Sequence, residues 1–339
     1  MQDCSWHDEQ FNMNKETDYS AIRLRDMGSF HIGGRTVQLR DQPEYERVMS
    51  AGGEPVRLNL NGSYAIEQMY VQYFLAERPN GKGPLVFWHG GGMTGAAWET
   101  TPDGREGWVN YFIRHGWDVY LCDAVERGRS GFAPWPQIWP DKPVIQTVDD
   151  IYSRFRIGKH AQGYDRDPAQ RTAYLNSRFP LAAFDQFAKQ MVPRWTHTND
   201  AIVNAFKALL DRLGSASIVC HSQAGPLALQ LAAGHPEQIR TLVAIEPAGI
   251  PDINTNEYRT PTLIVLGDNI DTDSRWQRLR EKILTFSSVV PEAHVLSLPE
   301  VGLRGNSHVM MMDTNNRDIA QLVNGWLARR LASFTGQAS

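Results

Sequence analysis

A serine that follows a short apolar run is the strongest chemical signal in this sequence. Ser222 comes directly after residues 217–221 (SIVCH) and opens a run of small and apolar residues typical of a buried helix. A sharp turn from strand to helix exposes a serine hydroxyl, which a nearby base can then activate. The usual pattern is G-x-S-x-G. Here Cys220 and Ala224 flank the serine and Gly225 comes one place later. Because all three are small, we predict that Ser222 is a nucleophile.

A run of glycines upstream predicts a site for negative charge. Residues 84–88 (PLVFW) indicate a buried strand, and His89 and three glycines follow it. Free backbone N–H groups in such a loop can bind the oxyanion that forms when a serine attacks an ester. The N–H of the residue after the nucleophile usually provides the other hydrogen bond. We therefore predict that Gly91 and Gln223 form an oxyanion hole.

The base that such a serine needs is predicted to be His308. This histidine lies in a polar, glycine-broken loop, residues 302–308, which follows an apolar strand around residues 295–298 and precedes a C-terminal helix. Its late position fits the chain order serine, acid, histidine that accompanies this kind of turn. His221 is the rival because it adjoins Ser222. Neighbouring residues on a tight turn point in different directions, so we expect His221 to have a supporting or packing role.

Two carboxylates are candidates for the acid that orients the histidine. Asp268 follows the apolar residues 263–267, where this arrangement most often carries its acid, but aspartate also suits a turn such as Gly-Asp-Asn. Glu246 follows the apolar residues 242–245. A buried carboxylate without a partner is costly, which favours Glu246 as the group that orients an imidazole. The residues alone leave both candidates open.

Strand and helix patterns alternate through most of the chain. Apolar strands near 85–88, 119–122 and 218–220 are separated by helical segments, and Ile202, Phe206, Leu209, Leu210 and Leu213 recur at helical spacing. This alternation predicts an α/β fold with a doubly wound, mostly parallel sheet. Residues 29–39 and 56–76 read as extended segments with turns at Gly33-Gly34 and Asn61-Gly62. They predict N-terminal antiparallel hairpins at one sheet edge.

The regular pattern breaks between residues 131 and 195, which are rich in proline and aromatic residues. We interpret 131–195 as a cap inserted into one catalytic domain formed by residues 1–130 and 196–339. A cap above the serine would exclude water and shape an apolar pocket for a bulky or aromatic substrate. The expected substrate contacts are Gly92, Met93, Trp135 and Trp139.

Composition excludes several other classes of protein. A chain of 339 residues with a formal net charge of -4 can bury one large core, and it shows no extended basic face for nucleic acid. The longest apolar runs are strand-sized, which predicts no membrane span. Cys4, Cys122 and Cys220 lack metal-ligand spacing, and no nucleotide-binding loop occurs, so we expect no metal and no cofactor.

The sequence also leads to expectations about location and assembly. Residues 1–18 are polar and lack the apolar core of a signal peptide. We expect a cytoplasmic protein, with a trimmed secreted or periplasmic mature form as the alternative. The expected partner is a small-molecule ester or lactone, and the sequence leaves room for a homodimer.

Together the motifs resemble a family of bacterial serine esterases, the Alcaligenes-type α/β-hydrolase esterases. The resemblance spans residues 68–330 and is carried by the segments HG at 89–90, MTG at 93–95, WETTPDGR at 98–105, RGRS at 127–130, HSQ at 221–223, EP at 246–247 and GNSH at 305–308. It implies an α/β-hydrolase fold and a triad of Ser222, His308 and Glu246, with Asp268 in a structural role. It also implies that Gly91 and Gln223 donate the oxyanion hydrogen bonds.

The sequence departs from the family pattern at two places. Gly91 and Gly92 replace an adjacent cysteine pair, so no vicinal disulfide can stiffen the loop, which must be more mobile or held by packing. Cys220 and Ala224 stand where the family has serines. The triad chemistry is unaffected by either change.

These residues predict two-step acyl transfer on a carboxylic ester. A lactonase would use the same groups on a cyclic ester. A lyase would use Ser222 and His308 without an acyl-enzyme, and a ligand receptor on the same fold would lack turnover. Trapping an acyl-serine separates the esterase and lactonase from the other two functions.

Overall fold

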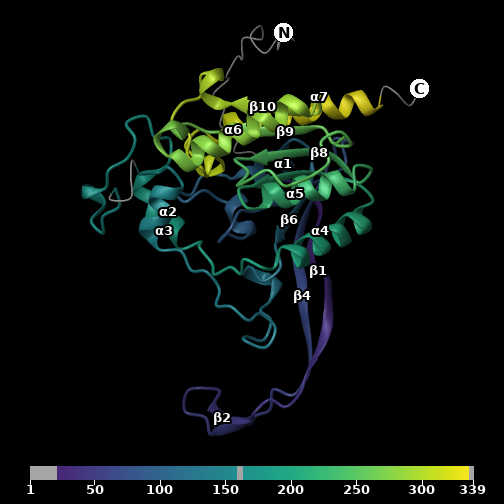
Figure 1. The fold of residues 1–339 in the computed structure, drawn as a ribbon, viewed down its shortest axis with the longest axis vertical. Helices are drawn as coiled ribbons and strands as arrows, with labels where there is room; N and C mark the ends of the chain where they lie inside the picture. Colours follow the sequence, from purple (N-terminus) through teal and green to yellow (C-terminus); the bar gives the residue numbers. More distant parts are fainter. Residues whose placement is uncertain (1–20, 159–162, 336–339) are drawn as a thin grey trace.

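An eight-stranded sheet forms the centre of the molecule in the computed structural model, which describes residues 21–158 and 163–335 (Figure 1). The strand order is β1-β4-β6-β5-β7-β8-β9-β10. The parallel strands are β6 (Asp118–Asp123), β5 (Pro84–Trp88), β7 (Ala216–His221), β8 (Ile239–Ile245), β9 (Thr262–Leu266) and β10 (Ala293–Ser297). This sheet confirms the predicted fold class.

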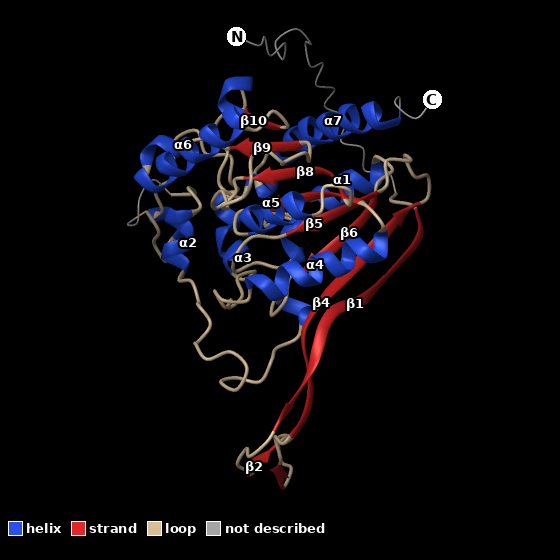
Figure 2. Cartoon of the chain, turned by 45° about the vertical axis from the view of Figure 1, so that its right-hand side comes forward, coloured by secondary structure: helices blue, strands red, loops and turns tan. Residues whose placement is uncertain are grey.

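Helices cover both faces of the sheet (Figure 2). They are α1 (Trp108–Arg114) and α7 (Asn316–Thr335) on one face, and α4 (Asn199–Leu213), α5 (Ala224–Gly234) and α6 (Ser274–Val289) on the other. Alternate strand residues point to opposite faces. Leu85 and Phe87 therefore pack under α1, whereas Val86 packs under α4 and α5 and Trp88 stacks on Phe206 at 3.5 Å between ring centroids. Burial on both faces explains why these strands are apolar throughout.

Short 3-10 helices connect the larger elements. They are η1 (Gly95–Trp98), η2 (Gly128–Ser130), η3 (Pro168–Gln170), η4 (Leu181–Ala183), η5 (Ile270–Thr272), η6 (Leu298–Val301) and η7 (Met310–Met312). The turns η6 and η7 flank the loop that carries His308, so this loop is held at both ends by local structure.

A long antiparallel arm extends away from the body of the molecule (Figures 1 and 2). It is formed by β1 (Leu24–Leu39) and β4 (Gly62–Ala76) where they run beyond the central sheet, in which β4 pairs with β6 over residues 70–74. Its tip carries the small sheet β2 (Tyr45–Val48) and β3 (Pro55–Leu58). The predicted turn at Gly33-Gly34 is wrong. Both glycines have positive φ, yet β1 continues through them in unchanged register, because glycine adopts this backbone without steric cost.

The segment 131–195 lies between β6 and α4 and has little regular structure. It contains α2 (Val148–Arg154) and α3 (Phe184–Ala188). Many of its aromatic side chains are buried in the same core cluster as α1 and α7, namely Tyr152, Phe155, Phe179, Phe184 and Phe187. The segment is therefore packed on the body of the molecule, beside the C-terminal ends of the strands.

The expectations about residues 1–18 and Cys4 lie outside the described residues. In the two ranges that the structure describes, no helix has the length and apolar character needed to cross a membrane. Within these same ranges, no group of three or more His, Cys, Asp or Glu side chains is arranged to hold a metal ion.

Candidate active site

Ser222 sits on a strained turn between β7 and α5. Its φ is +52°, a backbone conformation that is costly for a residue with a side chain. The turn is fixed by hydrogen bonds: the Ser222 N–H donates to the Ile245 carbonyl at 3.0 Å, and the Ser222 carbonyl accepts from the Gly225 N–H at 2.9 Å. A Cβ at position 225 would lie 2.3 Å from the Pro247 Cβ, so only glycine lets the helix approach this closely. The turn directs the Ser222 side chain into a cavity.

His308 contacts both Ser222 and Glu246. The Ser222 hydroxyl donates to Nε2 of His308 at 2.9 Å, and Nδ1–H of His308 donates to Oε2 of Glu246 at 2.7 Å. The imidazole is buried between Phe155 and Trp276, whose ring centroids lie 5.1 and 4.6 Å away. This is the linear arrangement that general-base activation of a serine requires.

A buried carboxylate holds the loop that carries His308. Asp313 accepts hydrogen bonds at 2.8 Å from both the Ser307 N–H and the Ser307 hydroxyl, and at 3.0 Å from the Asn306 side-chain amide. Burial raises the pKa of Asp313 to about 6, although these hydrogen bonds favour the charged form. The loop therefore depends on a carboxylate whose ionisation the protein interior opposes.

His221 supports the same loop from the other side. Its Nε2–H donates to the His308 carbonyl at 2.8 Å, and its ring lies 4.6 Å from the His308 ring. Burial lowers the pKa of His221 well below its ordinary value, so the ring is neutral. Within the described chain His221 forms no hydrogen bond with the Ser222 hydroxyl, which agrees with the supporting role expected from the sequence.

Glu246 is the carboxylate that meets His308. Its Oε1 accepts from the Gly267 N–H at 2.7 Å and from Nη2 of Arg156, with which it forms a fully buried ion pair. Burial opposes ionisation, but the positive charge of Arg156 and the hydrogen bond from His308 outweigh it and lower the pKa of Glu246 to about 2. Glu246 is therefore ionised at neutral pH.

Asp268, the other candidate acid, binds loops instead. Its carboxylate accepts from the Gly305 N–H at 2.7 Å, from the Asn176 amide at 3.1 Å and from the Asn269 N–H at 2.7 Å. These contacts tie the segment 131–195 and the His308 loop to the end of β9. Asp268 has no hydrogen bond to His308 within the described residues.

Arg156 is a site residue that sequence reasoning missed. It follows α2, has a φ of +53°, and is buried with its Cζ 4.6 Å from the Trp276 ring centroid. Besides binding Glu246, it donates from Nε to the Asp268 carbonyl at 2.9 Å. No motif marks this arginine. The available signal was indirect, because a buried glutamate requires a cation or several donors near it.

The electrostatic balance at His308 keeps its imidazole neutral at neutral pH. Burial lowers the pKa of His308, and the Arg156 and Arg275 charges act in the same direction, while Glu246 opposes them. A neutral imidazole can accept the serine proton, and the ionised Glu246 then stabilises the imidazolium that forms.

The glycine loop borders the cavity opposite His308. His89 orients this loop, because its Nδ1–H donates to the Gly90 carbonyl at 2.8 Å and its Nε2 accepts from the Ala124 N–H at 2.9 Å. Gly91 and Gln223 both line the cavity. Across residues 21–158 and 163–335, no hydrogen bond uses the N–H of either residue.

Contacts from the segment 131–195 hold this loop in the absence of a cysteine pair. The Val192 N–H donates to the Gly92 carbonyl at 2.8 Å. Gly92 has a φ of +70°, and a Cβ there would lie 2.6 Å from Oε1 of Gln146 and 2.9 Å from Cε of Met191. Hydrogen bonding and packing therefore fix the loop.

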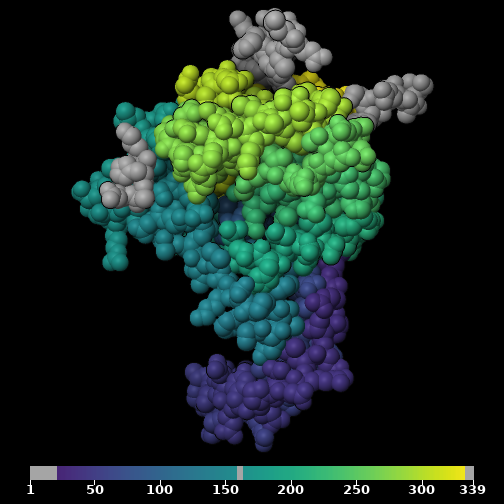
Figure 3. Space-filling model, viewed as in Figure 1, coloured from purple at the N-terminus to yellow at the C-terminus, as the bar shows by residue number. Residues whose placement is uncertain are grey.

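The cavity above Ser222 has a volume of about 470 Å³, which suits a small organic ligand. Its lining residues are Gly91, Gln146, Arg154, Phe155, Arg194, Ser222, Gln223, Ala248, Gly249, Ile250, Arg275, Trp276, Arg278, Leu279, Lys282 and His308. Figure 3 shows a hollow where the segment 131–195 and α6 meet.

Four expected substrate contacts do not line this cavity. Met93 is buried in the core, and Gly92 faces Gln146 and Met191. Trp135 is 42% exposed and donates from Nε1 to the Asp141 carbonyl, while Trp139 packs beside His197. The aromatic walls come instead from Phe155 and Trp276, which spacing along the chain could not identify.

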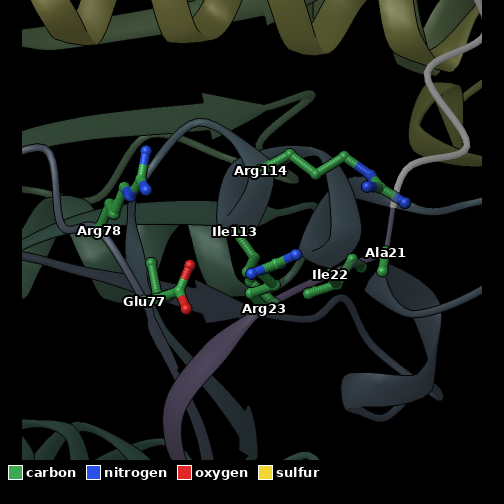
Figure 4. Close-up of a pocket in the computed structure, with 9 residues that line it drawn as sticks. Ala21, Ile22, Arg23, Glu77, Arg78, Ile113 and Arg114 are labelled. Carbon is green, nitrogen blue, oxygen red and sulfur yellow. The ribbon is translucent and has the colours of Figure 1, made fainter.

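A second cavity of about 470 Å³ lies near the end of β4 and α1, away from Ser222 (Figure 4). Its charged lining residues are Arg23, Glu77, Arg78 and Arg114. Its lining, among the residues that the structure describes, includes no serine, histidine or cysteine. The chemistry expected from the sequence therefore belongs to the cavity above Ser222.

Comparison with known proteins agrees with this geometry. The family described as alpha/beta hydrolase fold matches residues 83–285, which is more than half of the chain. The chain belongs to the α/β-hydrolase fold family. A solved structure described as a novel bacterial esterase is 30% identical, with a TM-score of 0.79, and the match covers 93% of this chain and 99% of that chain. The predicted resemblance to bacterial esterases is thereby confirmed.

Two curated lipases are also similar in sequence. A probable secreted lipase of a fungal species, phiG, is 28% identical over an alignment 334 residues long, and the match covers 80% of this chain and 88% of the relative. Lipase LipV of Mycobacterium tuberculosis is 39% identical over 82 residues, 23% of this chain and 31% of the relative.

Proposed function

We propose that Ser222, His308 and Glu246 catalyse the hydrolysis of carboxylic esters through an acyl-enzyme. The observation that carries this proposal is the continuous hydrogen-bond chain from the Ser222 hydroxyl through His308 to Glu246. The α/β-hydrolase family, the esterase structure and the two lipases support the reaction class. The chain is a serine-type carboxylic ester hydrolase.

In the first step, Oγ of Ser222 attacks the ester carbonyl while its proton passes to Nε2 of His308. Glu246 stabilises the imidazolium, and the N–H groups of Gly91 and Gln223 stabilise the oxyanion. Each such donor contributes about 3 kcal/mol in comparable enzymes. His308 then donates its proton to the leaving alcohol, and the acyl group remains on Ser222.

In the second step, His308 takes a proton from water as the water attacks the acyl-enzyme, and Ser222 leaves with its own proton restored. The acid product is released. Every step uses side chains and backbone groups of this chain.

The segment 131–195 acts as a cap in this proposal. Phe155 and Arg194 reach the cavity from it, and Arg156 from the same segment holds Glu246. Phe155 and the Trp276 ring of α6 offer an apolar surface to a bulky or aromatic part of the substrate. A cyclic ester would meet the same groups, so lactone hydrolysis is the alternative substrate class.

Compartment and assembly also belong to the proposal. We expect a cytoplasmic location, with a secreted mature form as the alternative because the fungal relative is a probable secreted lipase. A homodimer remains part of this expectation. The partner of the active site is a small-molecule ester or lactone.

The test is covalent labelling by an aryl phosphonate probe, followed by intact mass and peptide mapping. One adduct on Ser222 is expected, and Ser222→Ala should fold normally and remain unlabelled. An unlabelled wild-type protein would contradict the acyl-enzyme mechanism. Product analysis on paired linear and cyclic esters then separates esterase from lactonase activity.

A further inference from the structure

The active-site cavity has a strongly cationic lining. Arg154, Arg194, Arg275, Arg278 and Lys282 line it. Arg154 pairs with Asp150 and Arg275 with Asp273, but the described lining itself contains no aspartate or glutamate. The whole chain has a formal net charge of -4, so this concentration of positive charge is opposite to the molecule's average. We infer that the cavity takes esters that carry an anionic group, a carboxylate or a phosphate. This inference rests on the proposed ester hydrolysis at Ser222 and defines its substrate class.

Arg194 places an uncompensated cation next to the proposed oxyanion hole. A Cβ built on Gly91 would lie 2.9 Å from Nη1 of Arg194. The Nε of this guanidinium is buried, and within the described chain it has neither a hydrogen-bond partner nor a paired carboxylate. Burial lowers the pKa of Arg194, and the nearby Arg154 charge acts in the same direction. An anion bound here would offset an unfavourable concentration of positive charge.

The N-terminal half of α6 presents a second group of cations. Arg275, Arg278, Leu279 and Lys282 follow one another at the spacing of a single helix face, and all line the cavity. Arg275 pairs with Asp273 at 3.2 Å. Arg278 and Lys282 have no ion pair in the part of the chain that the structure describes. Part of this positive charge is therefore available to a ligand.

Charge of one sign around a cleft attracts and orients an oppositely charged substrate. Guanidinium groups suit carboxylate and phosphate oxygens because they donate parallel hydrogen bonds. Phe155 and Trp276 add an apolar surface to the lining of the same cavity. The preferred ester should thus combine an apolar or aromatic body with one anionic group.

Matched substrates test this inference directly. The purified full chain is assayed at low and high salt with para-acetoxybenzoate and its neutral counterpart para-acetoxybenzamide, and with monophenyl terephthalate and its carboxamide. The first pair places the anion on the alcohol side and the second places it on the acyl side. Para-acetoxyphenyl phosphate separates phosphate from carboxylate preference. We expect a preference in kcat/KM of about tenfold or more for the anionic member of at least one pair, reduced by salt.

Variants assign the preference to the cavity cations. Arg194→Gln and the double variant Arg278→Gln/Lys282→Gln should each lower the ratio of anionic to neutral kcat/KM severalfold. Arg280→Gln is the matched control, because Arg280 lies on the same helix but pairs with Asp271 and does not line this cavity. It should keep the wild-type ratio.

The outcomes separate this inference from the proposed function. In one outcome, Ser222 is labelled and the neutral esters are cleaved, but neither substrate pair nor the phosphate shows a preference for the anionic ester. This result would overturn the proposed substrate class and leave the proposed esterase activity intact. A ratio that Arg194→Gln and the double variant do not change would also overturn it. Failure to cleave any ester, with Ser222 unlabelled, would overturn both.

Discussion

At the scale of single residues, the choice of acid has the clearest experimental consequence. Glu246 contacts His308, whereas Asp268 binds the Gly305 and Asn269 N–H groups. Glu246→Gln should lower kcat/KM on the order of 10³-fold or more, because the imidazolium loses its ionised partner. Asp268→Asn should cost less than about tenfold, since an amide oxygen can still accept one of these hydrogen bonds. Steady-state kinetics with circular dichroism as a folding control measures both. A larger loss in Asp268→Asn would reverse the assignment.

A second residue-scale prediction concerns pH. Burial and the neighbouring Arg156 and Arg275 charges lower the pKa of His308 below the ordinary value of 6.5. Only the neutral imidazole accepts the serine proton, so the acid limb of kcat/KM should have its midpoint below pH 6.5. A pH–rate profile with a neutral ester checks this. An acid limb with its midpoint above pH 6.5 would contradict this, because it would show that the effect of Glu246, which raises the pKa of His308, outweighs burial and the two arginine charges.

At the scale of elements, the carboxylate of Glu246, at the end of β8, depends on an arginine from the segment 131–195. The Arg156 charge lowers the pKa values of both Glu246 and His308. Arg156→Met should therefore reduce kcat more than it raises KM, and should move the acid limb of the pH–rate profile to higher pH. Arg156→Lys keeps the charge and should keep the limb near its wild-type position. A variant that loses activity without any movement of the limb would assign Arg156 a purely structural role.

Local patterns were sufficient to predict most of the core elements. The strands β5 to β9 and the helix α4 follow from apolar runs and helical spacing, and the elbow at Ser222 follows from small residues at a strand end. The turn predicted at Gly33-Gly34 was wrong because a pair of glycines is expected both at a turn and at positions of positive φ inside a long strand. Arg156, Arg194 and Trp276 could not be predicted, since segments distant in sequence bring them to the cavity and no local periodicity encodes that contact.

At the scale of the whole molecule, the buried Asp313 should make stability depend on pH. Its pKa is about 6 in the folded protein and 3.8 when exposed, so between these values the folded state binds more protons than the unfolded state. Its contribution to the free energy of unfolding should therefore fall as pH rises from about 4 to 6, by at most about 3 kcal/mol.

The measurement for Asp313 is urea unfolding of the wild type and of Asp313→Asn at several pH values. Their difference in unfolding free energy isolates this carboxyl from the other titrating groups. The wild type should lose stability relative to the variant as pH rises through this window. A difference that is constant with pH would contradict the raised pKa.

The Arg156–Glu246 ion pair also has a consequence for exchange of parts between related proteins. Its two members come from the segment 131–195 and from the end of β8. A hybrid protein that combined the strands of this protein with the corresponding segment of another protein would lose Arg156. The carboxylate of Glu246 would then be buried without a cation to pair with. Such a hybrid would therefore be inactive unless the new segment supplied an equivalent cation. The segment 131–195 and the strands that carry Glu246 are thus constrained to be inherited together.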